Sequence, residues 1–110
     1  MIDSLTNSLQ HYMDLLTMRQ KLVASNIANA DTPGYKTQDI DFQTSLESVM
    51  DGGIPHQVEV KGLTIKNDGN NVDLDREARL LAENDLRFSI ATNLMKGAFA
   101  TVKEAIKENL

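Results

Sequence analysis

The chain has 110 residues, with 11 basic and 16 acidic side chains and a net charge of −5, and its length favours a single domain over residues 1–110. It has no cysteine, which excludes a disulfide framework, a thiolate zinc site and a thiol nucleophile. It also has no basic cluster to neutralise nucleic-acid phosphates, and no apolar run approaching the ~20 residues that span a bilayer.

The N-terminal segment predicts a helix over about residues 4–30. Asp3 or Ser4 can cap its start, because short polar side chains accept the first free backbone N–H groups. Pro33 and Gly34 end it, since proline disfavours helical backbone before it and glycine permits a positive φ. Apolar side chains recur along it at steps of three and four residues: Leu5, Leu9, Tyr12, Leu16, Val23, Ile27 and Ala30.

Glycine and proline concentrate in the middle of the chain, which predicts turns and short elements there. We expect a turn and a short helix over about residues 31–50, with Asp41 as the N-cap and Met50 near the end. We interpret Asp39 and Asp41 as solvated carboxylates of the turn before that helix.

The next segment, about residues 51–72, predicts a loop with a weak β-hairpin. Residues 58–60 and 63–65 each alternate apolar and polar side chains, as half-buried strands do. Lys61 and Gly62 between them suit a tight turn. The signal is weak because each run is only three residues long.

The C-terminal segment predicts a second long helix over about residues 74–108. Asp73 suits its N-cap, and Asp75 and Glu77 place negative charge where the helix dipole favours it. Gly97 costs such a helix about 1 kcal/mol relative to Ala, and we interpret it as a point where another backbone approaches closely. The apolar side chains follow a seven-residue repeat, with Asn84 at one position of the same seam: Leu81, Phe88, Ala91, Met95, Ala98, Val102 and Ala105.

Two long terminal helices predict a mainly α fold, an antiparallel coiled-coil-like hairpin with the short helix and the loop or weak β-hairpin between its arms. Their apolar stripes are wider than a coiled-coil seam, which leaves apolar surface for another chain. We therefore expect helices that are completed by partners and partly disordered in isolation. The packing interface is expected to join Leu5, Leu9, Leu16, Val23 and Ile27 to Phe88, Met95, Val102 and Ile106.

The sequence offers little for catalysis, and we expect no enzyme activity, metal or cofactor. His11 and His56 lie in different segments, so no His pair has metal-binding spacing. The stretch from Asp68 to Asp75 is faintly like a calcium loop, but Val72 stands where an oxygen ligand is needed. A small metal-dependent enzyme is the alternative within the enzyme class.

One specific motif lies at the end of the N-terminal helix: Asn26, Asn29, Thr32, Pro33, Gly34 and Tyr35. Asn is a poor helix former, and closing the helix end explains Asn29 but not Asn26. This Asn-x-x-Asn step followed by Thr-Pro-Gly-Tyr resembles the N-terminal signature of the bacterial flagellar axial proteins, which are the rod, hook and hook-associated proteins. Residues 36–42 and 69–77 are also similar to short rod members of that family, so the resemblance covers nearly the whole chain.

The resemblance implies a structural subunit of the proximal rod of the flagellar basal body. Such a subunit self-assembles through its terminal helices into a drive shaft that transmits torque and surrounds the export channel. The implied partners are other copies of the chain, other rod proteins, the adaptor FliE, the MS ring and the flagellar export gate. The resemblance also assigns the Asn-x-x-Asn and Thr-Pro-Gly-Tyr residues to the turn and to inter-subunit contacts.

The implied location is the periplasmic rod, reached from the cytoplasm through the flagellar type III apparatus. This agrees with the first residues, which have no basic stretch followed by an apolar core, so we expect no Sec-type signal. The alternative is a cytoplasmic helical adaptor or export chaperone that binds one partner through the same apolar stripes. Within the family, a different rod subunit is a further alternative.

Overall fold

The computed structural model describes residues 2–109. Its elements are three helices and two short strands: α1 (Ile2–Ala28), β1 (Gln38–Ile40), α2 (Phe42–Met50), β2 (Gln57–Glu59) and α3 (Leu74–Glu108). The predicted mainly α fold with two long terminal helices is confirmed. The observed ends of α1 and α3 lie within two residues of the predicted ones.

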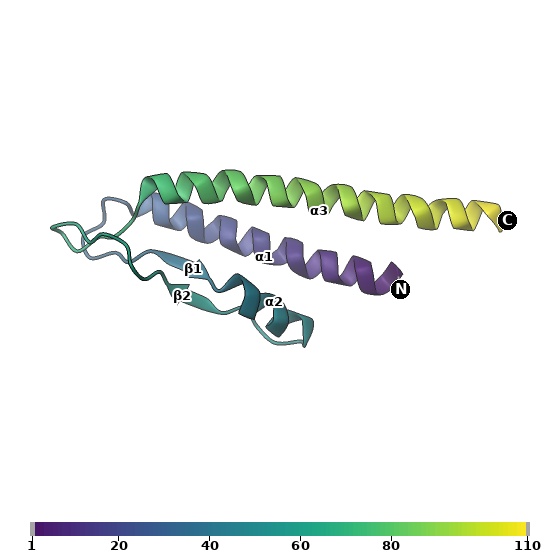
Figure 1. The fold of residues 1–110 in the computed structure, drawn as a ribbon, viewed down its shortest axis with the longest axis horizontal. Helices are drawn as coiled ribbons and strands as arrows, with labels where there is room; N and C mark the ends of the chain where they lie inside the picture. The colour runs from purple at the N-terminus through teal and green to yellow at the C-terminus, as the bar shows by residue number, and fades with distance from the viewer. Residues whose placement is uncertain (1, 110) are drawn as a thin grey trace.

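The molecule is elongated, with extents of 68 × 26 × 17 Å. The helices α1 and α3 run antiparallel side by side, so both chain ends lie at the same end of the hairpin (Figure 1). The small elements β1, β2 and α2 lie along another side of α1. Because α3 has 35 residues and α1 has 27, the C-terminal part of α3 extends past the start of α1.

The helix caps follow local sequence rules in two of the three helices. Asp41 accepts a hydrogen bond from the Thr44 amide (3.3 Å) at the start of α2, as predicted. Asp73 accepts from the amide of Asp75 (3.0 Å) at the start of α3, also as predicted. The predicted cap at Asp3 or Ser4 is wrong, because α1 begins at Ile2 and both residues lie inside its first turn.

The antiparallel sheet forms between different segments from those predicted. The strand β2 pairs with β1, placing Gln38 opposite Glu59 and Ile40 opposite Gln57, and residues 63–65 form no strand. An isolated two-stranded hairpin is marginally stable, whereas β1 packs on α1 and buries the Ile40 side chain. The strand β2 therefore pairs with β1, which α1 already anchors, and not with residues 63–65 across the local turn.

The interior holds few apolar side chains. Among the described residues, the buried apolar ones are Leu15, Leu16, Val23, Ile40, Val72, Ala91 and Ala98. The buried polar ones are as numerous: Asn26, Thr37, Asp39, Ser45, Asn70, Asn71, Glu77 and Asn84. The predicted seam is buried at its centre, at Asn84, Ala91 and Ala98. Burying a polar group costs free energy unless it is hydrogen-bonded. The hydrogen bonds of these buried polar residues therefore determine how the elements are arranged.

Candidate assembly site

Asn26, on the last turn of α1, is the centre of the polar interior. Its side chain is wholly buried, with an exposed fraction of 0%. The amide nitrogen donates to the Gln38 carbonyl (2.8 Å) and to Glu77 Oε1 (3.2 Å). The amide oxygen accepts from the Tyr35 hydroxyl (2.8 Å) and from the Gln38 backbone N–H (3.0 Å). Asn26 thus uses the full hydrogen-bonding capacity of its side-chain amide to join α1, β1 and α3. These contacts explain why an asparagine stands at this position, which closing the helix end did not.

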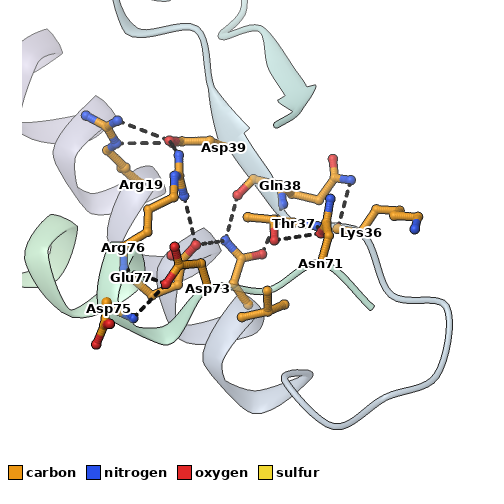
Figure 2. A network of polar contacts seen from close by, with 12 residues as sticks. Arg19, Lys36, Thr37, Gln38, Asp39, Asn71, Asp73, Asp75, Arg76 and Glu77 are labelled. Atoms are coloured by element: carbon orange, nitrogen blue, oxygen red, sulfur yellow. Dashed lines mark hydrogen bonds and ion pairs between the residues drawn. The ribbon is translucent and has the colours of Figure 1, made fainter. Parts of the chain in front are cut away.

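Asp39 on β1 is the second centre, and Figure 2 shows Arg19 and Arg76 converging on it. Arg19 from α1 donates to both carboxylate oxygens, at 3.1 and 3.0 Å. Arg76 from α3 donates to Asp39 Oδ2 (2.7 Å) and to Glu77 Oε1 (2.8 Å). Two guanidinium groups and two carboxylates balance in charge, although Glu77 Oε2 is buried without a hydrogen-bond partner in the described residues.

The interpretation of Asp39 as a solvated turn residue is therefore wrong, because only 5% of it is exposed. Its neighbour Asp41 is exposed, as expected. Sequence reasoning also missed Arg19, Arg76 and the burial of Glu77. These partners are 20 or more positions apart in the chain, or on another element, and no local pattern links them to Asp39.

The turn after α1 is held by side chains from both of its sides. Asn29 donates to the Ser25 carbonyl (2.8 Å) and accepts from the Thr32 hydroxyl (3.0 Å). Asn70, from the loop before α3, donates to the carbonyls of Asn29 (2.8 Å) and Thr32 (2.9 Å). Gly34 has a φ of +75°, a conformation that L side chains rarely adopt.

Two loop residues that the sequence left unassigned complete this corner. Asn71 accepts from both the amide (2.7 Å) and the hydroxyl (2.9 Å) of Thr37. Lys66 donates to the Ala30 carbonyl (2.9 Å), a favourable place for a cation because helix C-terminal carbonyls carry partial negative charge. We call the contacts made by Asn26, Asp39, Asn70, Asn71, Arg76 and Glu77 the junction network.

The motif residues thus lie together at one end of the hairpin, and their burial divides them. Asn26 is buried, and Asn29 and Tyr35 are half-buried. Thr32, Pro33 and Gly34 are exposed at the tip. The inward part of the motif fixes the turn, and the exposed tip is free to meet another chain.

The predicted helix interface is brought together only at its centre. Leu16 and Val23 are buried, and Leu9, Met95 and Val102 are half-buried. The other four positions stay exposed: Leu5 (48%), Ile27 (40%), Phe88 (37%) and Ile106 (56%). Leu5 and Leu9 line an apolar groove with Leu46 and Met50 of α2, so this part of α1 faces α2 as well as α3.

A second apolar surface on α3 was missed in part. Leu86, Ile90 and Leu94 are 62%, 52% and 57% exposed and follow one another at steps of four residues, so they share one side of the helix. We call these three residues the outer ridge. Leu86 and Ile90 were missed because they lie off the seam of the seven-residue repeat, although their four-residue spacing was visible in the sequence.

Arg87 ties the middle of α3 to α1. Its guanidinium donates to Glu83 Oε1 (2.7 Å) and to the Tyr12 hydroxyl (3.4 Å). The bond to Tyr12 raises the pKa of Arg87 above its ordinary value, and the bond to Glu83 adds to the effect. Arg87 is therefore occupied within the chain and is a weak candidate for contacts to another one.

Neither a metal-holding cluster nor a membrane-spanning helix is found in residues 2–109. Within residues 2–109, no group of three or more His, Asp and Glu side chains is placed to hold a metal ion. His11 is half-buried on α1, and His56 is exposed just before β2. None of the helices in this range is both long and apolar enough to cross a membrane.

The chain is similar in sequence to known flagellar rod proteins. The family model described as flagella basal body rod protein matches residues 13–36, which include the whole motif. The chain is 33% identical to the flagellar basal body rod protein FlgB of Borrelia hermsii, covering 87% of the chain and 90% of that relative. It is also 33% identical to FlgB of Escherichia coli, covering 88% of the chain and 91% of the relative. FlgB of Borreliella burgdorferi is 30% identical, with 87% and 90% coverage.

An elongated helical hairpin with a polar junction and uncovered apolar faces defines a structural subunit of a larger assembly. The chain belongs to the FlgB family of flagellar basal body rod proteins. It is therefore a structural component of the flagellar basal body rod, and it associates with other flagellar rod components. The resemblance to short rod members of the flagellar axial family is confirmed.

Proposed function

We propose that the chain self-assembles through its terminal helices into the proximal part of the rod. In this position the subunits transmit torque as a drive shaft and surround a central export channel. The proposal assigns the chain no catalytic step: its work is mechanical. Its partners are further copies of itself, other rod proteins, the adaptor FliE, the MS ring and the export gate.

The observation that supports this proposal is that more large apolar side chains are exposed than apolar side chains are buried. The described residues include thirteen exposed large apolar side chains, and only seven apolar side chains are buried. Seven of the exposed ones lie on α3: Leu74, Leu86, Phe88, Ile90, Leu94, Phe99 and Ile106. Large apolar patches are rare on soluble monomers, and where they occur they mark protein–protein contacts. Neighbouring helices in a rod would cover it.

The proposed location is the periplasmic rod, reached by export from the cytoplasm through the flagellar type III apparatus. The fold suits such a route, because few buried apolar contacts hold the distal parts of α1 and α3. The exposed tip at Thr32, Pro33 and Gly34 would contact neighbouring subunits, while Asn26 and Asn29 hold it in shape from behind.

Gene deletion with fractionation tests the proposed function. Cells that lack the gene should assemble no rod and no external filament, and the wild-type gene supplied in trans should restore both. A tagged chain should then co-purify with detergent-extracted basal bodies.

The export chaperone alternative predicts a different fraction. A chaperone would be recovered from the cytosol in a soluble complex of fixed stoichiometry with one partner, and basal bodies would lack it. That result would contradict the proposed function.

A further inference from the structure

The helix α3 borders two different surfaces on opposite flanks, one apolar and one that mixes polar and apolar side chains. The first is the outer ridge of Leu86, Ile90 and Leu94. Gly97 lies on the same side of α3, because positions separated by three, seven and eleven residues share one face of a helix. A Cβ at Gly97 would meet nothing within 4 Å, so none of the described residues fills the space that the glycine leaves open.

The second surface consists of two hollows between α1 and α3, which together we call the side groove. One part of it, of about 240 Å³, is lined by Thr17 and Gln20 of α1 and by Asn84, Asp85 and Phe88 of α3. A larger part, of about 700 Å³, lies nearer the chain ends and is lined by Thr6, Gln10, Phe99 and Val102 among others. At about 100° per residue, Phe88 and Phe99 lie roughly half a turn around α3 from the outer ridge.

The side groove contains polar atoms that lack partners. Asn84 is only 4% exposed, and its Oδ1 has no hydrogen bond within the described structure, although its Nδ2 donates to Leu16 O and Gln20 Oε1. The Thr6 hydroxyl is likewise buried and without a partner in residues 2–109. Buried groups of this kind cost free energy until a donor or acceptor reaches them. The groove is thus incomplete in polar as well as in apolar terms.

The two surfaces carry opposite charges. Asp85 is exposed at the end of the side groove nearest the junction network. Arg79 is exposed on the ridge side of α3, one to two turns before Leu86, and so also toward the junction. Neither side chain forms an ion pair within the described residues. A parallel arrangement of two copies brings Arg79 of one copy toward Asp85 of the other, whereas an antiparallel one brings Arg79 toward Asp3, which lines the other end of the groove.

From these observations we infer that the outer ridge of one copy inserts into the side groove of a second copy, with the two α3 helices parallel. The partner is another copy of this chain because that copy supplies both the apolar ridge and the charge that the groove lacks. The contact is heterologous, so each copy keeps a free ridge or a free groove and addition continues into a ring or a helical array. This inference deepens the proposed function and rests on it.

Disulfide cross-linking tests the contact without background, because the chain contains no cysteine. Purified Ile90→Cys protein is mixed with purified Gln10→Cys or Thr17→Cys protein at high concentration and oxidised. We expect a cross-linked dimer in the mixture and in neither variant alone. The double variant Ile90→Cys with Thr17→Cys should give a ladder of multimers. A matched control, Thr44→Cys on the exposed surface of α2, should give no dimer with Ile90→Cys.

Two results would overturn the inference. No dimer from either mixture would mean that the ridge does not meet the groove. Efficient cross-linking of Ile90→Cys alone would mean that ridge meets ridge in a closed two-fold dimer. Neither result bears on the presence of the wild-type chain in basal bodies, so failure of this contact and failure of the proposed function remain distinguishable.

Charge exchange tests the parallel alignment. Arg79→Asp alone and Asp85→Arg alone should each reduce the cross-linked fraction, because each places like charges at the contact. The variant carrying both substitutions restores opposite charges and should recover the wild-type yield. Loss that the double variant does not recover would contradict the alignment.

Discussion

At the scale of single residues, Asn26 shows why a polar side chain can hold an element that apolar packing does not. Its four hydrogen bonds reach the backbone of β1, the Tyr35 hydroxyl and Glu77 on α3. A leucine in its place would bury more apolar surface but would leave the Gln38 N–H and C=O without partners. The asparagine therefore positions β1 as well as filling space.

The substitution Asn26→Ala tests this role. We expect a loss of about 2–4 kcal/mol in the stability of the junction network, because the part-buried backbone groups of Gln38 and the buried Glu77 carboxylate lose hydrogen bonds. Amide hydrogen exchange at β1 and at the start of α3 measures it, and protection should fall by about thirty-fold or more. The matched control Asn93→Ala removes an exposed asparagine of α3 and should leave the same amides unchanged. Equal protection in both variants would contradict the role of Asn26.

The structural role of a residue could be predicted from the sequence where its hydrogen-bond partners are close to it in the chain. The caps Asp41 and Asp73 were visible because each side chain bonds an amide two or three positions ahead. The burial of Asp39 was not, because its partners come from α1 and α3 and only the tertiary fold brings them within 3.1 Å. Asn26 was visible as an anomaly, but its hydrogen bonds to Tyr35, Gln38 and Glu77 were not.

At the scale of elements, Asp39 ties three of them at once. Arg19 belongs to α1, Asp39 to β1 and Arg76 to α3, and the two arginine side chains are 19% and 18% exposed. Partial burial weakens the screening of these pairs by salt. The start of α3 is thus fixed to α1 through β1 and not only through direct helix packing.

The substitution Asp39→Asn should loosen all three elements together. It keeps the shape but removes the charge that two guanidinium groups share, and we expect destabilisation of about 2–3 kcal/mol. Urea unfolding followed by circular dichroism measures the change. Asp14→Asn, on the exposed face of α1, is the control and should shift the midpoint little. An unchanged midpoint for Asp39→Asn would show that the ion pairs do not hold the junction.

Substitutions at Gly97 distinguish its effect on the stability of α3 from its effect on self-association. Gly97→Ala should stabilise α3 in the isolated chain by about 1 kcal/mol, because alanine is the better helix former and its Cβ meets nothing within 4 Å. Gly97→Leu should reduce self-association, since a long side chain beside the outer ridge blocks a close backbone approach. Helix content from circular dichroism and mass from sedimentation velocity measure the two effects. Undiminished association of the leucine variant would contradict the close approach.

The helices could be predicted from sequence more readily than the sheet. Helix periodicity and caps act over a few residues, so α1, α2 and α3 emerge from local pattern. The register of β1 with β2 depends on which strand is already anchored on α1, and that information lies outside either three-residue strand. The local turn at Lys61 and Gly62 therefore suggested the wrong partner.

At the scale of the whole molecule, stabilising contacts are concentrated at one end of a 68 Å long hairpin. The junction network ties α1, β1 and α3 with buried hydrogen bonds and ion pairs. Toward the chain ends the two long helices meet through fewer buried side chains, and Ile106, in the last turn of α3, is 56% exposed. The central claim is that the junction folds within one chain and that neighbours complete the distal helices.

Hydrogen exchange of the dilute purified chain, read along α3, tests this claim most directly. The account predicts protected amides near the junction network, around Glu77, and fast exchange beyond Phe88, with protection spreading to the C-terminal turns only when the chain assembles. Uniform protection from Asp75 to Lys107 in the dilute monomer, lost in one cooperative transition, would contradict it.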